Sequence, residues 1–200
     1  MNDTLMIVLA GVLFMALFNV LFFLRREGIS LRFLIEAAVI TAVSALLPAV
    51  FGVALHPIAF LAIIYVLTMR VRIFTDLGSA LARRGNLSMA AKVFSFAGNL
   101  LPDPAGGLMV RLNQGACALQ RGAIEEAIPV FQAVLEKAET SRLGIKQRAA
   151  CHYNLGIAFW KQGKIGEAER ELGEVQDLWP ASAFARKAEK ALGKLREKNE

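Results

Sequence analysis

Apolar residues dominate the first third of the chain, whereas the remainder alternates apolar and polar positions. Residues 4–24 carry only Thr4 and Asn19 as polar side chains. About 20 apolar residues suffice for a helix to cross the hydrocarbon core of a bilayer. An uncharged pattern of this length therefore predicts a transmembrane helix over about 4–24.

A cleaved signal peptide is the alternative for this segment, and its flanks argue against it. The N-terminal flank contains Asp3 but no Lys or Arg, and no small-x-small cleavage site follows the apolar run. The sequence LRREG follows instead, which is typical of a stop-transfer flank. We therefore expect an uncleaved anchor.

A second apolar stretch covers residues 33–69, which is too long for one comfortable crossing and long enough for two. Gly52 and Pro57 offer a break, because proline disfavours helix at the residue before it. The pattern predicts a helical hairpin, with helices over about 32–52 and 57–72. A single tilted or re-entrant segment is the alternative.

Basic residues beside the apolar segments predict the orientation. Arg25, Arg26 and Arg32 lie between the first two predicted spans, and Arg70 and Arg72 follow the third. Three crossings place both groups on one side, and basic flanks prefer the cytoplasmic side. We expect a multi-pass cell-membrane protein with an external N-terminus and a cytoplasmic C-terminal part. Because organellar targeting features are absent from the sequence, a bacterial inner membrane is the predicted location.

Beyond the last apolar segment the pattern changes to amphipathic helices in pairs. Small residues at fixed positions would let two antiparallel helices approach closely, large apolar residues would fill the remaining space, and KQGK would form the turn. The positions that follow this pattern near the C-terminus are Leu155, Gly156, Phe159, Ala168, Leu172, Val175 and Pro180.

The same spacing recurs twice upstream, with RRGN and QRGA at the turns. An interval of 12 residues separates a glycine from an alanine in all three units: Gly78 and Ala90, Gly115 and Ala127, Gly156 and Ala168. This spacing resembles the tetratricopeptide repeat (TPR), a helix–turn–helix unit of about 34 residues. The glycines are 37 and 41 residues apart, so we expect insertions near 105–107 and 141–147 that lengthen helices.

The resemblance implies an all-α fold in which N-terminal transmembrane helices precede a TPR-like α-solenoid. The predicted membrane region is 1–70, and the three repeats together cover 71–182, as 71–104, 108–141 and 149–182. The first helix of the first repeat begins at about Val71, directly after the last span, and the sequence leaves open whether it continues that span without a break. Residues 183–200 form a basic amphipathic helix that would cap the array, since repeat arrays need a polar outer face at their ends.

TPR proteins typically bind a peptide or helix in a groove lined by the first helix of each repeat. The positions that carry over from the resemblance as the partner groove are Met109, Leu112, Asn113, Ala116, Gln120, Tyr153, Asn154, Ile157, Trp160 and Lys161. The first repeat would add Arg72, Thr75, Ser79 and Arg83. The carboxylate clamp of chaperone-binding members has one match here, Asn113, so an apolar or amphipathic partner segment is favoured.

Charge and candidate chemistry add little to this picture. The net charge of +6 arises from Arg70 onward, where 20 basic and 14 acidic residues lie. Cys117 and Cys151 are isolated, so neither a disulfide framework nor a metal site is expected. Glu36 and His56 lie near predicted membrane interfaces, and we expect them to anchor rather than to conduct protons.

The sequence therefore predicts a membrane-anchored scaffold that recruits a protein or peptide partner and contacts membrane lipid. An accessory or assembly subunit of an intramembrane complex is the alternative, since small residues from Ala37 to Ala45 favour close helix packing. Without paired carboxylates, a phosphate loop or a nucleophile elbow, no enzyme, cofactor or metal is predicted. Basic residues are not interleaved with aromatic residues, so no nucleic-acid partner is expected.

Overall fold

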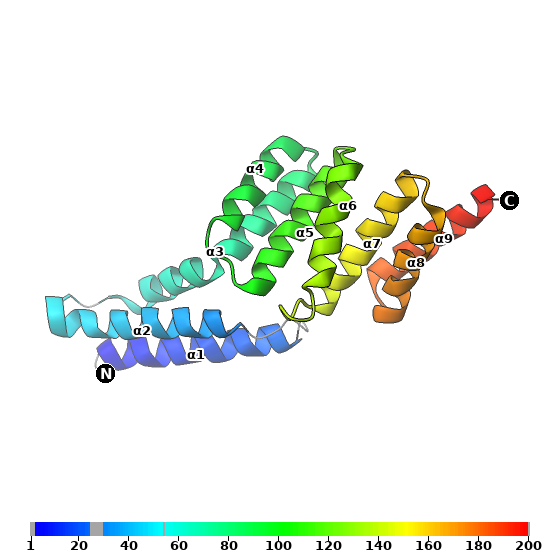
Figure 1. The fold of residues 1–200 in the computed structure, drawn as a ribbon. Coiled ribbons are helices and arrows are strands. Elements are labelled where there is room, and N and C mark those ends of the chain that lie inside the picture. Colours follow the sequence, from blue (N-terminus) through cyan, green and yellow to red (C-terminus); the bar gives the residue numbers. More distant parts are fainter. Residues whose placement is uncertain (1–2, 25–29, 54, 200) are drawn as a thin grey trace. The chain divides into compact units, whose positions relative to one another are not determined.

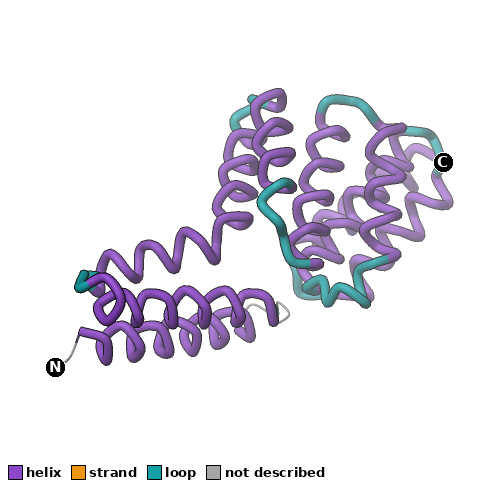
Figure 2. Tube along the Cα trace, turned by 60° about the vertical axis from the view of Figure 1, so that its left-hand side comes forward, coloured by secondary structure: helices purple, strands orange, loops and turns teal. Residues whose placement is uncertain are grey.

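The computed structural model describes residues 3–24, 30–53 and 55–199, which form nine helices and no strand (Figures 1 and 2). The chain divides into two compact units, Met1–Ile73 and Phe74–Glu200. The predicted all-α fold class, with three apolar helices before the TPR-like part, is confirmed.

Three apolar helices form the first unit: α1 (Asp3–Leu24), α2 (Leu31–Phe51) and the first part of α3 (Pro57–Arg83). Each is long and apolar enough to cross a membrane. The 21 residues of α2 correspond to about 32 Å of helix, close to the thickness of a hydrocarbon core. Gly52 ends α2 in the left-handed conformation, at φ 66°. The apolar stretch 33–69 therefore contains two helices, separated at Gly52, rather than one continuous segment.

The helices α1 and α2 run side by side and pack through small residues (Figure 1). A Cβ atom at Gly11 would collide with the side chain of Thr41. The Thr41 hydroxyl donates to the Ala37 carbonyl at 2.7 Å, which satisfies this polar group among apolar neighbours. The opposite sides of both helices expose large apolar residues, including Leu13 and Val43, as a lipid-facing surface requires.

The third helix continues from the predicted third span into the first repeat, one of the two outcomes that the sequence left open. It runs without a break from Pro57 to Arg83, so the predicted third span and the first helix of the first repeat are one helix. Nothing in the local sequence stops it, because no proline or glycine lies between Pro57 and Gly78. The predicted division of the chain near residue 70 falls inside this helix.

The second unit contains the rest of α3 and six further helices, which follow one another in chain order (Figure 1). The first two repeats add α4 (Leu87–Gly98), α5 (Pro104–Gln120) and α6 (Ile124–Glu136) to α3. The third repeat pairs α7 (Ile145–Lys161) with α8 (Ile165–Leu178), and α9 (Ala183–Asn199) follows. Each pair α3/α4, α5/α6 and α7/α8 corresponds to one predicted repeat.

The three glycines that carried the repeat pattern lie at equivalent helix–helix contacts. A Cβ atom at Gly78 would come within 2.5 Å of the Phe94 side chain. At Gly115 and Gly156 the same atom would come within 2.8 Å of the residue that matches Phe94 in the next repeats. The alanines of the pattern, Ala90, Ala127 and Ala168, are fully buried. Small residues at these positions thus set how closely the two helices of each repeat approach.

The turns inside the repeats also match one another. Gly85, Gly122 and Gly163 have φ values of 81°, 84° and 78°, a region that favours glycine. In the first turn the backbone N–H of Asn86 donates to the Leu81 carbonyl at 3.0 Å. Equivalent bonds of the same length close the other two turns, as expected for a left-handed helix cap.

The two insertions have different outcomes. Near 105–107 the extra residues lengthen α5, which begins at Pro104, as expected. Near 141–147 the expectation of longer helices is only partly right, because α6 already ends at Glu136 and only α7 gains residues. The residues between them form hydrogen-bonded turns. Leu143 is buried and packs in the core, so the turn is held in place by its own apolar residue.

Candidate partner-binding face

The first helices of successive repeats are neighbours in the second unit. The Ser79 hydroxyl of α3 donates to the Asn113 side-chain oxygen of α5 at 3.3 Å, α5 contacts α7, and α7 contacts α9. We use the name first-helix face for the side of these four helices that carries the predicted groove residues. The helix α9 extends the series as a fourth member without a second helix of its own.

The predicted groove residues differ in how much of each side chain the fold leaves accessible. Leu112 is only 5% exposed and packs in the core, so it is not available to a partner. Gln120 and Lys161 are exposed. The remaining positions are half-buried: Met109, Asn113, Ala116, Tyr153, Asn154, Ile157 and Trp160.

Part of the predicted apolar floor already packs within the chain. Ala116, Tyr153, Ile157 and Trp160 all contact the buried core cluster of the repeats. The Tyr153 ring also lies 6.0 Å from the Phe184 ring of α9. Burial raises the pKa of the Tyr153 hydroxyl above its ordinary value. What a partner can reach is therefore the edge of this floor and the polar residues around it.

The C-terminal helix does more than cover the last repeat. The Lys187 ammonium group lies 5.7 Å from the centre of the Phe184 ring, in cation–π geometry. The sequence predicted a capping helix here, and α9 contacts both α7 and α8. Its contact with Tyr153 is made by Phe184, an aromatic residue in an otherwise alanine- and lysine-rich segment.

Asn113, the single match to a carboxylate clamp, is already engaged. Its side-chain NH2 group donates to the Met109 carbonyl at 2.8 Å, and its oxygen accepts from Ser79. One of the two N–H groups of this amide is thus used within α5, and one remains as a donor.

A hydrogen-bonded contact between His152 of α7 and the buried Glu171 of α8 was missed at the sequence level. The His152 Nδ1 atom lies 2.9 Å from one carboxylate oxygen of Glu171, and Arg170 donates to the other at 3.0 Å. Burial raises the pKa of this carboxyl, but the hydrogen bonds and positive charges of His152 and Arg170 outweigh burial and lower it overall. The residues lie 19 positions apart, and no local pattern indicates that they meet.

The pair does not form part of a nucleophilic site. Cys151 is adjacent to His152 in the chain but is fully buried, and its thiol contacts the Phe131 carbonyl at 3.4 Å. Burial, reinforced by the negative charge of Glu171, raises the pKa of the Cys151 thiol to about 12. Among the described residues, no group of three or more His, Cys, Asp or Glu side chains is placed to hold a metal ion.

The ionisable residues of the first unit form specific contacts. Arg70 of α3 donates to both carboxylate oxygens of Glu36 on α2, at 2.6 and 2.9 Å. Arg32, one turn before Glu36, donates at 2.8 Å. His56 accepts from the backbone N–H of Ile58 at 3.3 Å, at the start of α3. Glu36 thus joins the two arms of the hairpin, a contact that the sequence did not predict.

Comparison with known proteins identifies the fold but no family. No protein-family model matches the chain, and no curated protein does so either. A solved structure of MamA from Desulfovibrio magneticus RS-1, residue 41 to the end, is 21% identical at a TM-score of 0.50. The match covers 82% of this chain and 85% of that one.

A second solved structure, the MamA RS-1 ArsTM double mutant, is 22% identical at a TM-score of 0.49, with the same coverage of both chains. MamA is a TPR-like, all-helical protein. The similarity to MamA residue 41 to the end, at a TM-score of 0.50, shows the TPR-like fold that the glycine spacing indicated.

Proposed function

We propose that the chain is a membrane-anchored scaffold without catalytic activity, which binds a partner protein or peptide on its first-helix face. The observation that carries this proposal is the succession of four adjacent first helices, α3, α5, α7 and α9. Such a row of helices suits an amphipathic helix or an extended segment whose apolar anchors supply most of the affinity. The TPR-like fold supports the proposal, because this architecture typically serves protein–protein interaction.

The chemistry of the face suggests the kind of partner. Half-buried Met109 and Ile157 offer apolar edges to an anchor side chain. Arg83, Lys161 and Lys187 are exposed basic residues on the same series of helices. We therefore expect a partner segment with an apolar anchor flanked by acidic residues. Binding of this kind weakens as salt is raised, since exposed charges are screened within about 8–10 Å.

We further propose that the C-terminal unit is cytoplasmic in a bacterial inner membrane and that the N-terminus is external. The ion pair between Glu36 and Arg70 supports a hairpin, because it brings the start of α2 beside a late position in α3. Arg32 and Arg70 then lie on one side of the bilayer, as the positive-inside rule favours.

Site-specific photo-crosslinking in the full-length chain tests the binding proposal. A crosslinking amino acid replaces Gln120 or Lys161, the exposed positions of the face, in native membranes. Matched controls replace Glu126 and Glu167, which are exposed on α6 and α8. We expect one common protein adduct from both face positions, reduced at high salt, and none from the controls. Adducts of equal yield from all four positions, or none from the face, would show the proposal to be wrong.

A role as a subunit of an intramembrane complex is the second candidate. The small residues Ala37 and Ser44 are used inside the chain, but Ala38 and Ala42 are exposed on α2 at a spacing of four residues. Small residues at this spacing allow helices to approach closely in membranes. Native mass measurement of the solubilised protein distinguishes the candidates, because a particle of one chain would count against stable assembly through these helices.

A further inference from the structure

The first repeat has an exposed apolar surface that the other repeats lack. Phe96 is 48% exposed and Leu101 is 69% exposed, and the Phe96 ring lies 4.8 Å from the ring of Phe74. We call the contacting pair Phe74 and Phe96, together with the exposed Leu101 that follows α4, the apolar edge. Exposed apolar surface beyond isolated residues marks a site of protein or membrane contact more often than chance.

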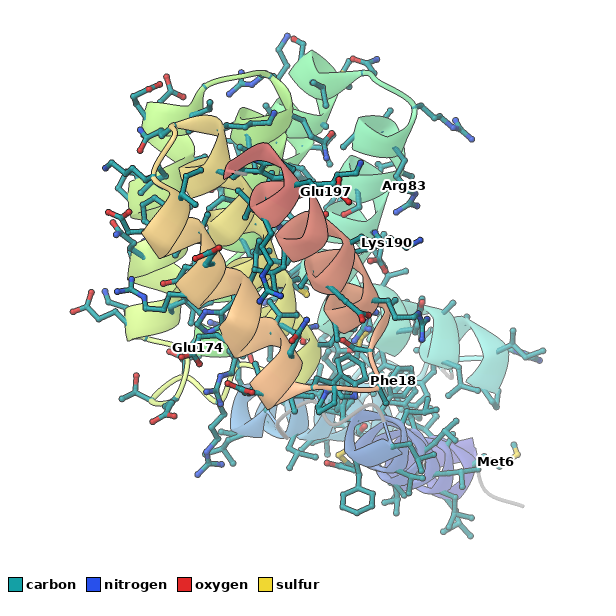
Figure 3. All side chains as sticks on the ribbon, turned by 90° about the vertical axis from the view of Figure 1, so that its right-hand side faces the viewer. Met6, Phe18, Arg83, Glu174, Lys190 and Glu197 are labelled. Carbon is teal, nitrogen blue, oxygen red and sulfur yellow. The ribbon has the colours of Figure 1, made fainter. Side chains whose placement is uncertain are left out.

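Equivalent positions in the later repeats show that the architecture itself does not require this surface. The repeat spacing aligns Phe96 with Ala133 and then with Glu174, which is exposed on α8 (Figure 3). It also aligns Met89, exposed on α4, with Glu126 and Glu167. Among the described helices of 10–17 residues, α4 is the one with an apolar composition. The apolar residues are thus a property of the first repeat alone.

The apolar edge lies close to the lipid-crossing segment along the chain. Phe74 follows Arg70 by four residues of the unbroken helix α3, which is about 6 Å of helix axis. The Phe96 ring contacts Phe74, and Leu101 follows α4 by three residues. The distance of Phe74 from Arg70 along the axis follows from continuity of α3 alone. Headgroup layers extend about 5–8 Å beyond the hydrocarbon core, so a span that ends near Arg70 would bring Phe74, and the Phe96 ring in contact with it, within reach of this layer.

We propose that the apolar edge inserts into the headgroup–acyl boundary of the bilayer, with lipid as its partner. The inference rests on the proposed membrane crossing of α1, α2 and α3, but not on partner binding by the first-helix face. Apolar side chains on surface segments insert about 5–10 Å into this boundary. The first repeat would then be held at the membrane by its own apolar side chains as well as by its covalent connection through α3.

Depth-dependent fluorescence quenching tests this proposal in the full-length chain in lipid nanodiscs. Phe96→Cys and Leu101→Cys are labelled separately with an environment-sensitive dye. Native Cys117 and Cys151 are almost fully buried, at 1% and 0% exposure, and do not compete for label. We expect lipids carrying a shallow nitroxide to quench both labels, and to quench them more than lipids carrying a deep nitroxide, because inserted side chains lie about 5–10 Å into this boundary. If replacing Phe96 disturbs the packing of Phe74, the Leu101→Cys variant still reports on the depth of the apolar edge.

Two controls separate the possible failures. Glu174→Cys, the equivalent position in the third repeat, should show no lipid quenching. Leu67→Cys, exposed on α3 within the apolar segment and about 4–5 Å of helix axis before Arg70, should be quenched by lipid nitroxides. Quenching at position 67 but not at 96 or 101 would overturn the lipid contact alone. Labels at 96 and 101 shielded from both lipid nitroxide and aqueous iodide would show that protein covers the edge. Absence of quenching at position 67 would overturn the membrane crossing and this proposal together.

Discussion

Gly156 and Gly173 lie on the paired helices of the third repeat but in different surroundings. A Cβ atom at Gly156 would come within 2.8 Å of Leu172, whereas at Gly173 nothing lies within 4 Å. The same chemical change, addition of one methyl group, therefore has opposite expected effects at the two positions. The effect depends on contact across the helix pair rather than on helix propensity.

We expect Gly156→Ala to lower the free energy of unfolding by about 1–3 kcal/mol, the usual cost of overpacking a tight contact. Gly173→Ala should raise it by about 0.5–1 kcal/mol, since alanine loses less conformational entropy in a helix. Chemical denaturation in detergent measures both, followed by tryptophan fluorescence. The tryptophans of the chain, Trp160 and Trp179, both lie in the third repeat or directly after it. Equal destabilisation by both variants would contradict the packing argument.

Glu171 gives the second unit a defined response to acid. Its pKa is lower in the folded chain than the ordinary value of 4.5. The ionised carboxylate therefore stabilises the fold above pH 4.5, and this contribution is lost as the pH falls through the folded pKa. We expect Glu171→Gln to lower the free energy of unfolding at neutral pH by about 1–3 kcal/mol. The free energy of unfolding of this variant should also decrease less as the pH falls. Denaturation across the acid range measures this, with exposed Glu174→Gln as control. Parallel pH profiles for wild type and Glu171→Gln would contradict it.

Residue-level prediction from sequence was accurate where the cause was local. Glycine and alanine spacings identified the tight contacts of all three repeats, because a short sequence distance brings Gly156 against Leu172 in any helix hairpin of this design. The pair of His152 and Glu171 was missed because its stability depends on the burial of both groups, which spacing does not reveal. Leu112 was assigned to the partner groove although it packs in the core, since repeat position alone does not determine accessibility.

At the scale of elements, the hairpin of α2 and α3 combines apolar packing with a charged contact. Glu36 receives two hydrogen bonds from Arg70 and one from Arg32. Arg32 is the more exposed of the two arginines, at 40% of its side chain against 24% for Arg70. The contact across the hairpin is therefore expected to be stronger than the contact along α2.

A double-mutant cycle with Glu36→Gln and Arg70→Gln tests this difference. We expect a coupling energy of about 0.5–3 kcal/mol for residues in direct contact. The matched cycle with Arg32→Gln should give a smaller value, because exposed ion pairs within a helix contribute about 0.3–0.5 kcal/mol. Detergent-titration unfolding of the full chain, followed by circular dichroism, measures both. A larger coupling with Arg32 would contradict the assignment.

Helix boundaries show where pattern reasoning reached its limit. The sequence placed the ends of α1 and α2 well, because apolar content changes abruptly at their flanks. It left open whether the third span continues into the first repeat, and α3 does continue to Arg83, since a change from apolar to amphipathic sequence does not interrupt a helix. The insertion near 141–147 forms a turn because Leu143 finds a place in the core, which depends on neighbouring helices.

At the scale of the whole molecule, the chain joins an apolar helical unit to a TPR-like unit. The fold class followed from two strong signals, the length of the apolar segments and the recurrence of a 12-residue interval. The apolar edge of the first repeat was not identified from the sequence, because it depends on which side chains remain exposed after packing.

Reporter fusions at either end test the proposed topology of the intact chain. A fusion at the C-terminus should be active only with a cytoplasmic reporter, and one at the N-terminus only with an external reporter, because basic residues flank the cytoplasmic ends of the spans. Replacing Arg25 and Arg26 by glutamine should cause a minor fraction of the chains to insert with the opposite orientation. Replacing Lys190 and Lys194, which are far from the spans in the sequence, should have no such effect. A C-terminus on the external side in the wild type would show the topology to be wrong.

The outward side of α9 bears on how copies of the chain can associate. Ala188, Ala191 and Leu195 of this helix are buried, while Lys187, Lys190, Lys194 and Glu197 are exposed (Figure 3). A neighbouring chain that stacked there would have to dehydrate several ammonium groups without an apolar surface in return. Stacking of a second copy on this side of α9 is therefore disfavoured, and association between copies would use other surfaces.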